Sequence, residues 1–126
     1  MCLASKFISE MQSIADRINV EFDKLSKLNS QLDKEISGIY HRIEQSNFNA
    51  YEGWLFSKEL QIALRKRREV KHEISRLHTL RREIDIPALK SNIQTAQSKV
   101  IKSKIENDTY KDHWQERYRV EDLQIH

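Results

Sequence analysis

The chain contains few residues that interrupt a helix: two glycines and one proline among 126 residues. Tight turns and β-bulges draw heavily on glycine, because it adopts left-handed backbone angles without a steric cost. Charged residues, by contrast, make up 33% of the chain. This composition disfavours a sheet and favours long helices, and the length predicts a single helical domain over residues 1–126.

Cysteine and long apolar runs are also scarce. Cys2 is the single cysteine, so the chain has neither an internal disulfide nor a cysteine cluster for zinc. No apolar run approaches the roughly 20 residues that cross a bilayer. The first residues reach an acid at Glu10 without the apolar core of a secretory signal. We therefore expect a cytoplasmic protein with no membrane partner.

Signatures of catalysis and of metal binding are missing as well. The sequence has no glycine-rich phosphate loop, and no nucleophile, base and orienting group can be assembled from it. His72 and His78 lie six residues apart, whereas two metal ligands on one helix face are usually four apart. We predict a protein that is not an enzyme, with no catalytic residues, no metal and no cofactor.

What the sequence does contain is a sustained apolar repeat. Residues seven apart are apolar at Met11, Ile18, Leu25, Leu32 and Ile39. A second set lies three or four residues from the first, at Ile14, Phe22, Leu28, Ile36 and Ile43. The repeat predicts a helix over residues 5–45, about 60 Å long, with a coiled-coil seam along one side.

Two breaks divide the rest of the chain. Asn49 and Glu52 form a capping pattern, and Phe48 is placed to pack on the first turn after it, so a second helix is expected over residues 50–84. Asp85 and Pro87 predict a third helix over 87–106. Thr109 then predicts a cap for a short helix over 110–120.

These elements predict an all-α fold, in which a long antiparallel helical hairpin of coiled-coil type is followed by a C-terminal helical region. The short connection at 46–49 makes the first two helices antiparallel neighbours. The second expected helix carries a stripe of its own, at Phe56, Leu60, Ala63, Arg67, Val70, Ile74, Leu77, Arg81 and Ile84. Two helices cannot cover both apolar stripes, so we expect a homo-oligomer, with a dimer favoured.

The second expected helix is strongly basic. Residues 64–82 contain eight Arg or Lys and two Glu, a net charge of +6. At helical spacing, Arg65, Arg68, Lys71 and Arg76 are candidates for binding a partner. Three interpretations stay open: a solvated face, a surface for an acidic protein or a nucleotide, and a nucleic-acid contact without a recognised DNA-binding motif.

Arg67 and Arg81 differ from these because the period places them in the seam. A buried charge needs a partner, and Glu21 and Glu35 of the first helix are the candidates. A structural ion pair is one interpretation. The other is a guanidinium pocket for an anion, which adjacent Arg82 would join.

Aromatic residues gather at the expected hairpin tip, at Phe48, Tyr51, Trp54 and Phe56. Core packing is the plain interpretation. Because a thin rod cannot easily bury four aromatics at its end, Tyr51 and Trp54 are also candidates for contact with a partner protein.

One stretch resembles a known group of proteins. The residues concerned are SNFNAYEGWLFSKELQIALRKRREVKHEI, within residues 44–74. The matching features are the turn from Glu44 to Asn49, Tyr51 with Gly53, Lys58 with Leu60, and Arg67-Arg68 with Lys71 and Glu73. The stretch is similar to small helical proteins encoded by bacteriophages of Gram-positive bacteria. The resemblance implies a protein that binds and disables a host protein, including a defence system.

Three functions follow as hypotheses. The first is a small interaction protein that inhibits or modulates a host protein. The alternative is an anion binder, for nucleic acid or for a signalling nucleotide held between protomers. The third is a purely structural assembly protein.

Overall fold

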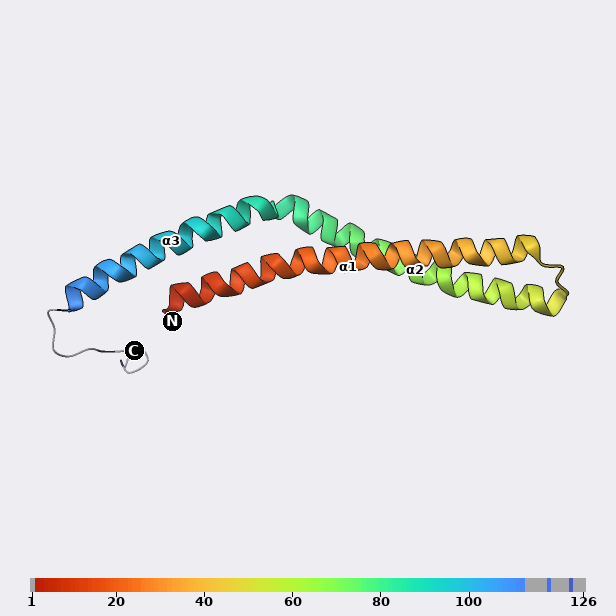
Figure 1. The fold of residues 1–126 in the computed structure, drawn as a ribbon, viewed down its shortest axis with the longest axis horizontal. Helices are drawn as coiled ribbons and strands as arrows, with labels where there is room; N and C mark the ends of the chain where they lie inside the picture. Colours follow the sequence, from red (N-terminus) through yellow and green to blue (C-terminus); the bar gives the residue numbers. More distant parts are fainter. Residues whose placement is uncertain (1, 113–117, 119–122, 124–126) are drawn as a thin grey trace.

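The computed structural model describes residues 2–112, 118 and 123, and these form three helices and no strand. They are α1 (Leu3–Gln45), α2 (Ala50–Ile84) and α3 (Ile86–Lys111). Figure 1 shows a long rod, in which α2 runs back along the C-terminal half of α1 and α3 continues along its N-terminal half. The predicted all-α fold with an antiparallel helical hairpin is confirmed.

Helix α1 begins two residues earlier than the apolar repeat predicted. The sulfur of Cys2 accepts a hydrogen bond from the backbone N–H of Ser5 at 3.4 Å and so caps the helix. Cysteine is not among the preferred capping residues, which is why the sequence pattern did not indicate this start. The helix ends at Gln45, as predicted.

The connection between α1 and α2 has the predicted cap at Asn49 and the predicted packing of Phe48. The side-chain oxygen of Asn49 accepts a hydrogen bond from the N–H of Glu52 at 2.9 Å, which satisfies a free donor of the first turn. Phe48 lies so close to Gly53 that an added Cβ would be 3.2 Å from its ring. The ring of Phe48 also meets Phe56 edge-on, with centroids 5.5 Å apart.

A single residue joins α2 to α3. Asp85 has a φ of 48°, a left-handed conformation that ends α2. Its side chain then caps α3 by accepting a hydrogen bond from the N–H of Ala88 at 3.2 Å. Pro87 follows in the first turn, where its missing N–H costs nothing.

The expected end of the third helix was wrong. Helix α3 runs to Lys111, so Thr109 and Tyr110 lie inside it and do not start a further helix. The Thr109 hydroxyl donates to the carbonyl of Ile105 at 2.9 Å, a bond typical of a helix interior. The remainder of the expected helix, at 113–117 and 119–120, lies outside the described residues.

The core lies where α1 and α2 face each other. Ile36, Ile39 and Ala63 are buried, and Ile43, Leu60 and Leu64 pack against them. Where α1 and α3 meet, the buried residues are Ile8 and Ala15 of α1 and Ile86 and Ile93 of α3.

The apolar repeat of α1 is covered along only part of its length. At matching heptad positions Leu32 and Ile39 are buried, Ile18 and Leu25 are half-buried, and Met11 is exposed. Helix α3 continues the cover that α2 provides, at Ile8 and Ala15, which precede buried Ile36 by four and three heptads. The prediction that Ile14 and Leu28 belong to the seam was wrong, because both are exposed.

Candidate interaction surface

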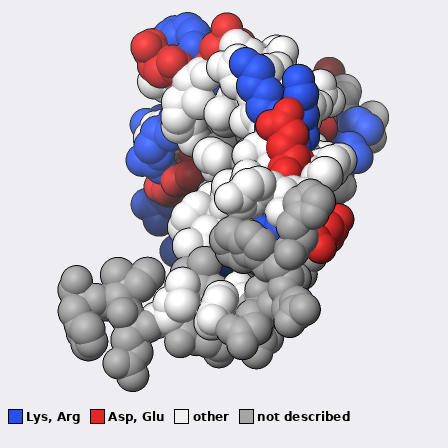
Figure 2. All heavy atoms as spheres, turned by 90° about the vertical axis from the view of Figure 1, so that its left-hand side faces the viewer, with Lys and Arg blue, Asp and Glu red and all other residues white. Residues whose placement is uncertain are grey.

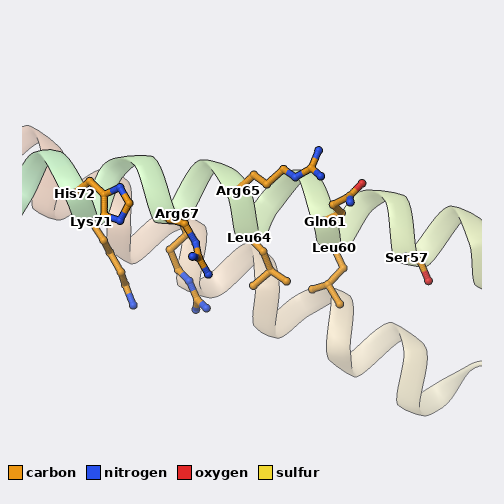
Figure 3. Close-up of a pocket in the computed structure, with 9 residues that line it drawn as sticks. Ser57, Leu60, Gln61, Leu64, Arg65, Arg67, Lys71 and His72 are labelled. Carbon is orange, nitrogen blue, oxygen red and sulfur yellow. The ribbon is translucent and has the colours of Figure 1, made fainter.

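A shallow groove of about 860 Å³ runs along one side of α2. It is lined by Ser57, Leu60, Gln61, Leu64, Arg65, Arg67, Arg68, Lys71 and His72. Figure 3 shows Leu60 and Leu64 pointing toward α1, while Arg65 points away from it. The groove therefore has an apolar floor beside the hairpin core and a basic rim, and it is called the basic groove below.

Helical spacing explains why these residues meet. Steps of three and four residues connect Gln61 to Arg65, Arg65 to Arg68 and Arg68 to His72, which places them on one side of a helix. Three of the four predicted basic contact residues, Arg65, Arg68 and Lys71, line the groove. The fourth, Arg76, is outside it.

The charges of the groove are largely uncompensated. Within the described residues, Arg65, Lys66, Arg68 and Lys71 make no ion pair. Arg76, in contrast, is bound by Glu73 one turn before it. Local pairing therefore neutralises Arg76 and leaves the groove cations available.

The tip aromatics fall into two pairs. Phe48 and Phe56 pack against each other, whereas Tyr51 and Trp54 are exposed and stack with ring centroids 6.4 Å apart. The ammonium of Lys58 lies 5.7 Å from the Trp54 ring centre. Trp54 precedes Gln61 by seven residues, so it extends the same helix side as the basic groove toward the tip.

The seam arginines have partners, but not the predicted ones. Arg67 donates to Asp33 at 3.1 Å, not to Glu35. The guanidinium of Arg81 lies 4.2 Å from the ring centre of Phe22, not against Glu21, which pairs with Lys24. The period placed both arginines in the seam, but both are only half-buried, so neither charge is buried.

A second cavity, of about 440 Å³, lies at the junction of the three helices. Its lining consists of Asn19, His78, Arg81, Arg82, Ile86, Pro87 and Lys90. Arg81 and Arg82, two of the predicted anion ligands, thus share one cavity, while Arg67 lies in the basic groove. The cations here are engaged, since Arg82 pairs with Glu83 and Lys90 with Asp16 at 3.0 Å.

Two groups have shifted pKa values, and neither lines the basic groove or the cavity at the helix junction. Hydrogen bonds from the side chain and backbone of Ser5 lower the pKa of the Cys2 thiol. The hydrogen bond with Glu59 raises the pKa of the Arg42 guanidinium and links α1 to α2. In the described part of the chain, no group of His, Cys, Asp and Glu residues forms a metal site, and no helix is long and apolar enough to cross a membrane.

The sequence did not predict the apolar floor. Leu60 was assigned to the seam, and Leu64 and Gln61 were not singled out. The signal was present, because both leucines lie within one turn of the basic residues. Comparisons of the chain with protein-family models, curated proteins and solved structures give no match.

Proposed function

We propose that this chain is a small interaction protein, and that the basic groove of α2 docks on an acidic surface of a partner protein. In the setting that the bacteriophage resemblance implies, the partner is a host protein, including one of a defence system, whose activity the chain inhibits or modulates.

One observation carries the proposal. Arg65, Arg68 and Lys71 surround an apolar floor, and none has an ion pair among the described residues. A solvated helix face needs no such floor. A protein surface that carries Asp and Glu beside an aliphatic anchor satisfies both parts of the groove, because apolar contacts fix the complex while charge steers its formation.

Trp54 supplies the second element of the surface. It is exposed, it stacks on Tyr51, and it lies on the same side of α2 as the groove. Exposed tryptophan beside basic residues is typical of a binding hot spot, because its large area is buried only when the partner arrives.

The experiment is affinity capture from the lysate of a Gram-positive host, followed by mass spectrometry. The wild-type chain is compared with Arg65→Glu/Arg68→Glu/Lys71→Glu. The control, Lys27→Glu/Lys34→Glu/Lys66→Glu, changes net charge equally but replaces residues outside the groove. An acidic protein captured by wild type and control, and lost with the groove variant, supports the proposal. Equal capture by all three contradicts it.

Anion binding is the second candidate, because at the helix junction Arg81 packs on Phe22 and has no carboxylate partner among the described residues. Arg81, Arg82 and Lys90 line the cavity at this junction with His78. A bound nucleotide or nucleic acid would raise the ratio of absorbance at 260 and 280 nm of the purified protein. A ratio equal to that of the pure protein, before and after extraction in high salt, contradicts this function.

A further inference from the structure

The N-terminal part of α1 presents an apolar stripe that no described residue covers. Leu3, Phe7, Met11 and Ile14 recur at steps of four, four and three residues, and they are 61%, 54%, 43% and 53% exposed. Half-buried Ile18 follows. Only Met11 and Ile18 share the heptad position of buried Leu32 and Ile39, so the stripe lies on a side of α1 next to the seam that α2 buries. Its steps of three and four residues are those of a helix–helix interface.

Helix α3 lies beside this stripe and not over it. In this half of α1, helix α3 buries Ile8 and Ala15. These residues directly follow Phe7 and Ile14 in the sequence, so they lie on a neighbouring side of the helix. The ion pair between Lys90 and Asp16, at 3.0 Å, holds α3 on that side. Figure 2, which looks at this end of the rod, shows uncharged surface between groups of charged side chains.

The open edge of the stripe carries two opposite charges seven residues apart, Glu10 and Arg17. Both are exposed, and neither forms an ion pair within the described chain. Glu10 and Arg17 occupy the same heptad position, on one side of the apolar stripe. In an antiparallel pair of helices this position faces the same position of the partner helix. In a parallel pair it faces the position on the other side of the stripe, which Ala15 and Phe22 occupy here.

We propose that residues 3–18 of α1 form an antiparallel interface with the same segment of a second copy of this chain. With a two-fold axis between residues 12 and 13, Met11 faces Ile14 of the second copy and Phe7 faces its Ile18. Glu10 then lies beside Arg17 of the second copy, and symmetry forms this ion pair twice. The second copy is thus a partner whose charges and apolar side chains both complement the stripe.

This interface does not depend on the proposed function, because it uses the opposite end of the rod from the tip of α2. It also gives the expected homo-oligomer a defined surface and direction. A dimer built in this way carries two basic grooves, one on each outward-pointing hairpin.

The test is sedimentation of the full chain over a micromolar concentration range. The wild type is expected at twice the chain mass of 15.1 kDa. Ile14→Glu is expected as a monomer, since it buries a charge at the centre of the interface. Ile62→Glu is the matched control: Ile62 on α2 is 52% exposed, against 53% for Ile14, and this variant should remain a dimer.

Circular dichroism of both variants separates loss of dimer from loss of fold. Because each isoleucine is half exposed, both variants should keep the wild-type helix signal. A wild-type monomer at all concentrations overturns the proposal, and so does a dimer that survives Ile14→Glu. The first result would mean that the stripe is not an interface between copies of this chain.

Charge exchange tests the direction of pairing. Glu10→Arg and Arg17→Glu should each weaken the dimer, by roughly tenfold in Kd for two symmetric contacts turned from attraction to repulsion. The double variant, Glu10→Arg with Arg17→Glu, should restore wild-type affinity. Single variants without effect, or a double variant that stays weak, overturn the antiparallel register.

Cys2 provides an independent check on direction. In the antiparallel arrangement the two Cys2 residues are separated by about 30 Å along the helix axis. A mild oxidant should therefore produce no disulfide-linked dimer at concentrations where sedimentation shows a dimer. Rapid and complete cross-linking would show parallel helices and overturn the proposal.

Discussion

Arg67 and Arg81 show how a charged residue is accommodated in an apolar seam. The side chain of Arg67 is partly buried, while its guanidinium reaches the exposed carboxylate of Asp33. Arg81 covers the face of Phe22, an attraction of about 0.5–1 kcal/mol at partly exposed sites. Neither charge needs the full desolvation that a buried ion would require.

The heptad period predicted that Arg67 would meet an acidic residue of α1. It did not determine which acidic residue this would be. Asp33 and Glu35 are two residues apart, and they lie on different sides of the helix. The choice depends on the rotation of α1 about its axis by a fraction of a turn. A heptad pattern leaves this rotation undetermined, and only packing against Leu64 and its neighbours fixes it.

At Gly38 we predict that alanine stabilises the protein. Gly38 lies inside α1 between buried Ile36 and Ile39, and an added Cβ would meet no atom within 4 Å. Gly38→Ala should therefore raise the free energy of unfolding by about 0.5–1 kcal/mol, because it restricts the unfolded chain without a clash. Urea unfolding followed by circular dichroism measures the change.

Gly53→Ala is the matched control for this substitution. It adds the same methyl group to a helix, but the new Cβ would lie 3.2 Å from the ring of Phe48. The gain should be smaller than at Gly38 or absent, since Phe48 must shift away from Phe56. An equal gain at both glycines would show that the contact with Phe48 has no influence on stability.

Among the elements, α3 departs most from expectation. Its cap at Asp85 was evident from capping chemistry and from Pro87, whereas its C-terminal end was predicted five residues too early. Thr109 resembled a cap because threonine favours that position. In the structure its hydroxyl bonds to Ile105 inside the helix, and the sequence alone does not distinguish these two uses.

The arrangement of α3 was also beyond the reach of the sequence. A turn at Asp85 is compatible with a helix that folds back on α2 and with one that continues along α1. The backbone angles of this single residue decide between them, and φ of 48° directs α3 along α1. This placement buries Ile8 and Ala15 and leaves the adjacent side of α1, with Phe7, Met11 and Ile14, exposed.

Asp85 performs two functions, and substitution separates them. Asp85→Asn should leave stability nearly unchanged, because asparagine also tolerates left-handed angles and also caps helices. Asp85→Ala should lower the free energy of unfolding by about 1–3 kcal/mol, since it loses the bond to Ala88 and retains the strained backbone. Thermal and urea unfolding of both variants provide the comparison.

Asp85→Gly distinguishes the two contributions. Glycine adopts positive φ without strain but has no side chain to accept the hydrogen bond from Ala88. Asp85→Gly should therefore lower the free energy of unfolding by less than Asp85→Ala does. If glycine and alanine destabilise equally, the left-handed conformation contributes nothing and the account of this junction is wrong.

On the scale of the whole molecule, the rod separates two surfaces. The basic groove and Trp54 occupy the hairpin end, and the exposed apolar stripe occupies the end where α1 begins. The sequence indicated the basic residues and the tip aromatics from their clustering. It did not indicate the leucine floor between them, because one leucine was already assigned to the seam.

The separation of charge and aromatic residues within the groove surface has a kinetic consequence. Unpaired cations act over a Debye length of about 10 Å and raise the rate of association. Trp54 acts only in contact and slows dissociation. The two kinds of substitution should therefore affect different rate constants for the same partner.

The most direct test of the docking surface is the kinetics of binding to the captured acidic protein, measured by surface plasmon resonance at several salt concentrations. The account predicts that Arg65→Glu/Arg68→Glu/Lys71→Glu lowers the association rate at least tenfold at low salt and removes most of its salt dependence. Trp54→Ala should instead raise the dissociation rate roughly tenfold or more. A charge-reversed variant that keeps the wild-type association rate and salt dependence would contradict the account.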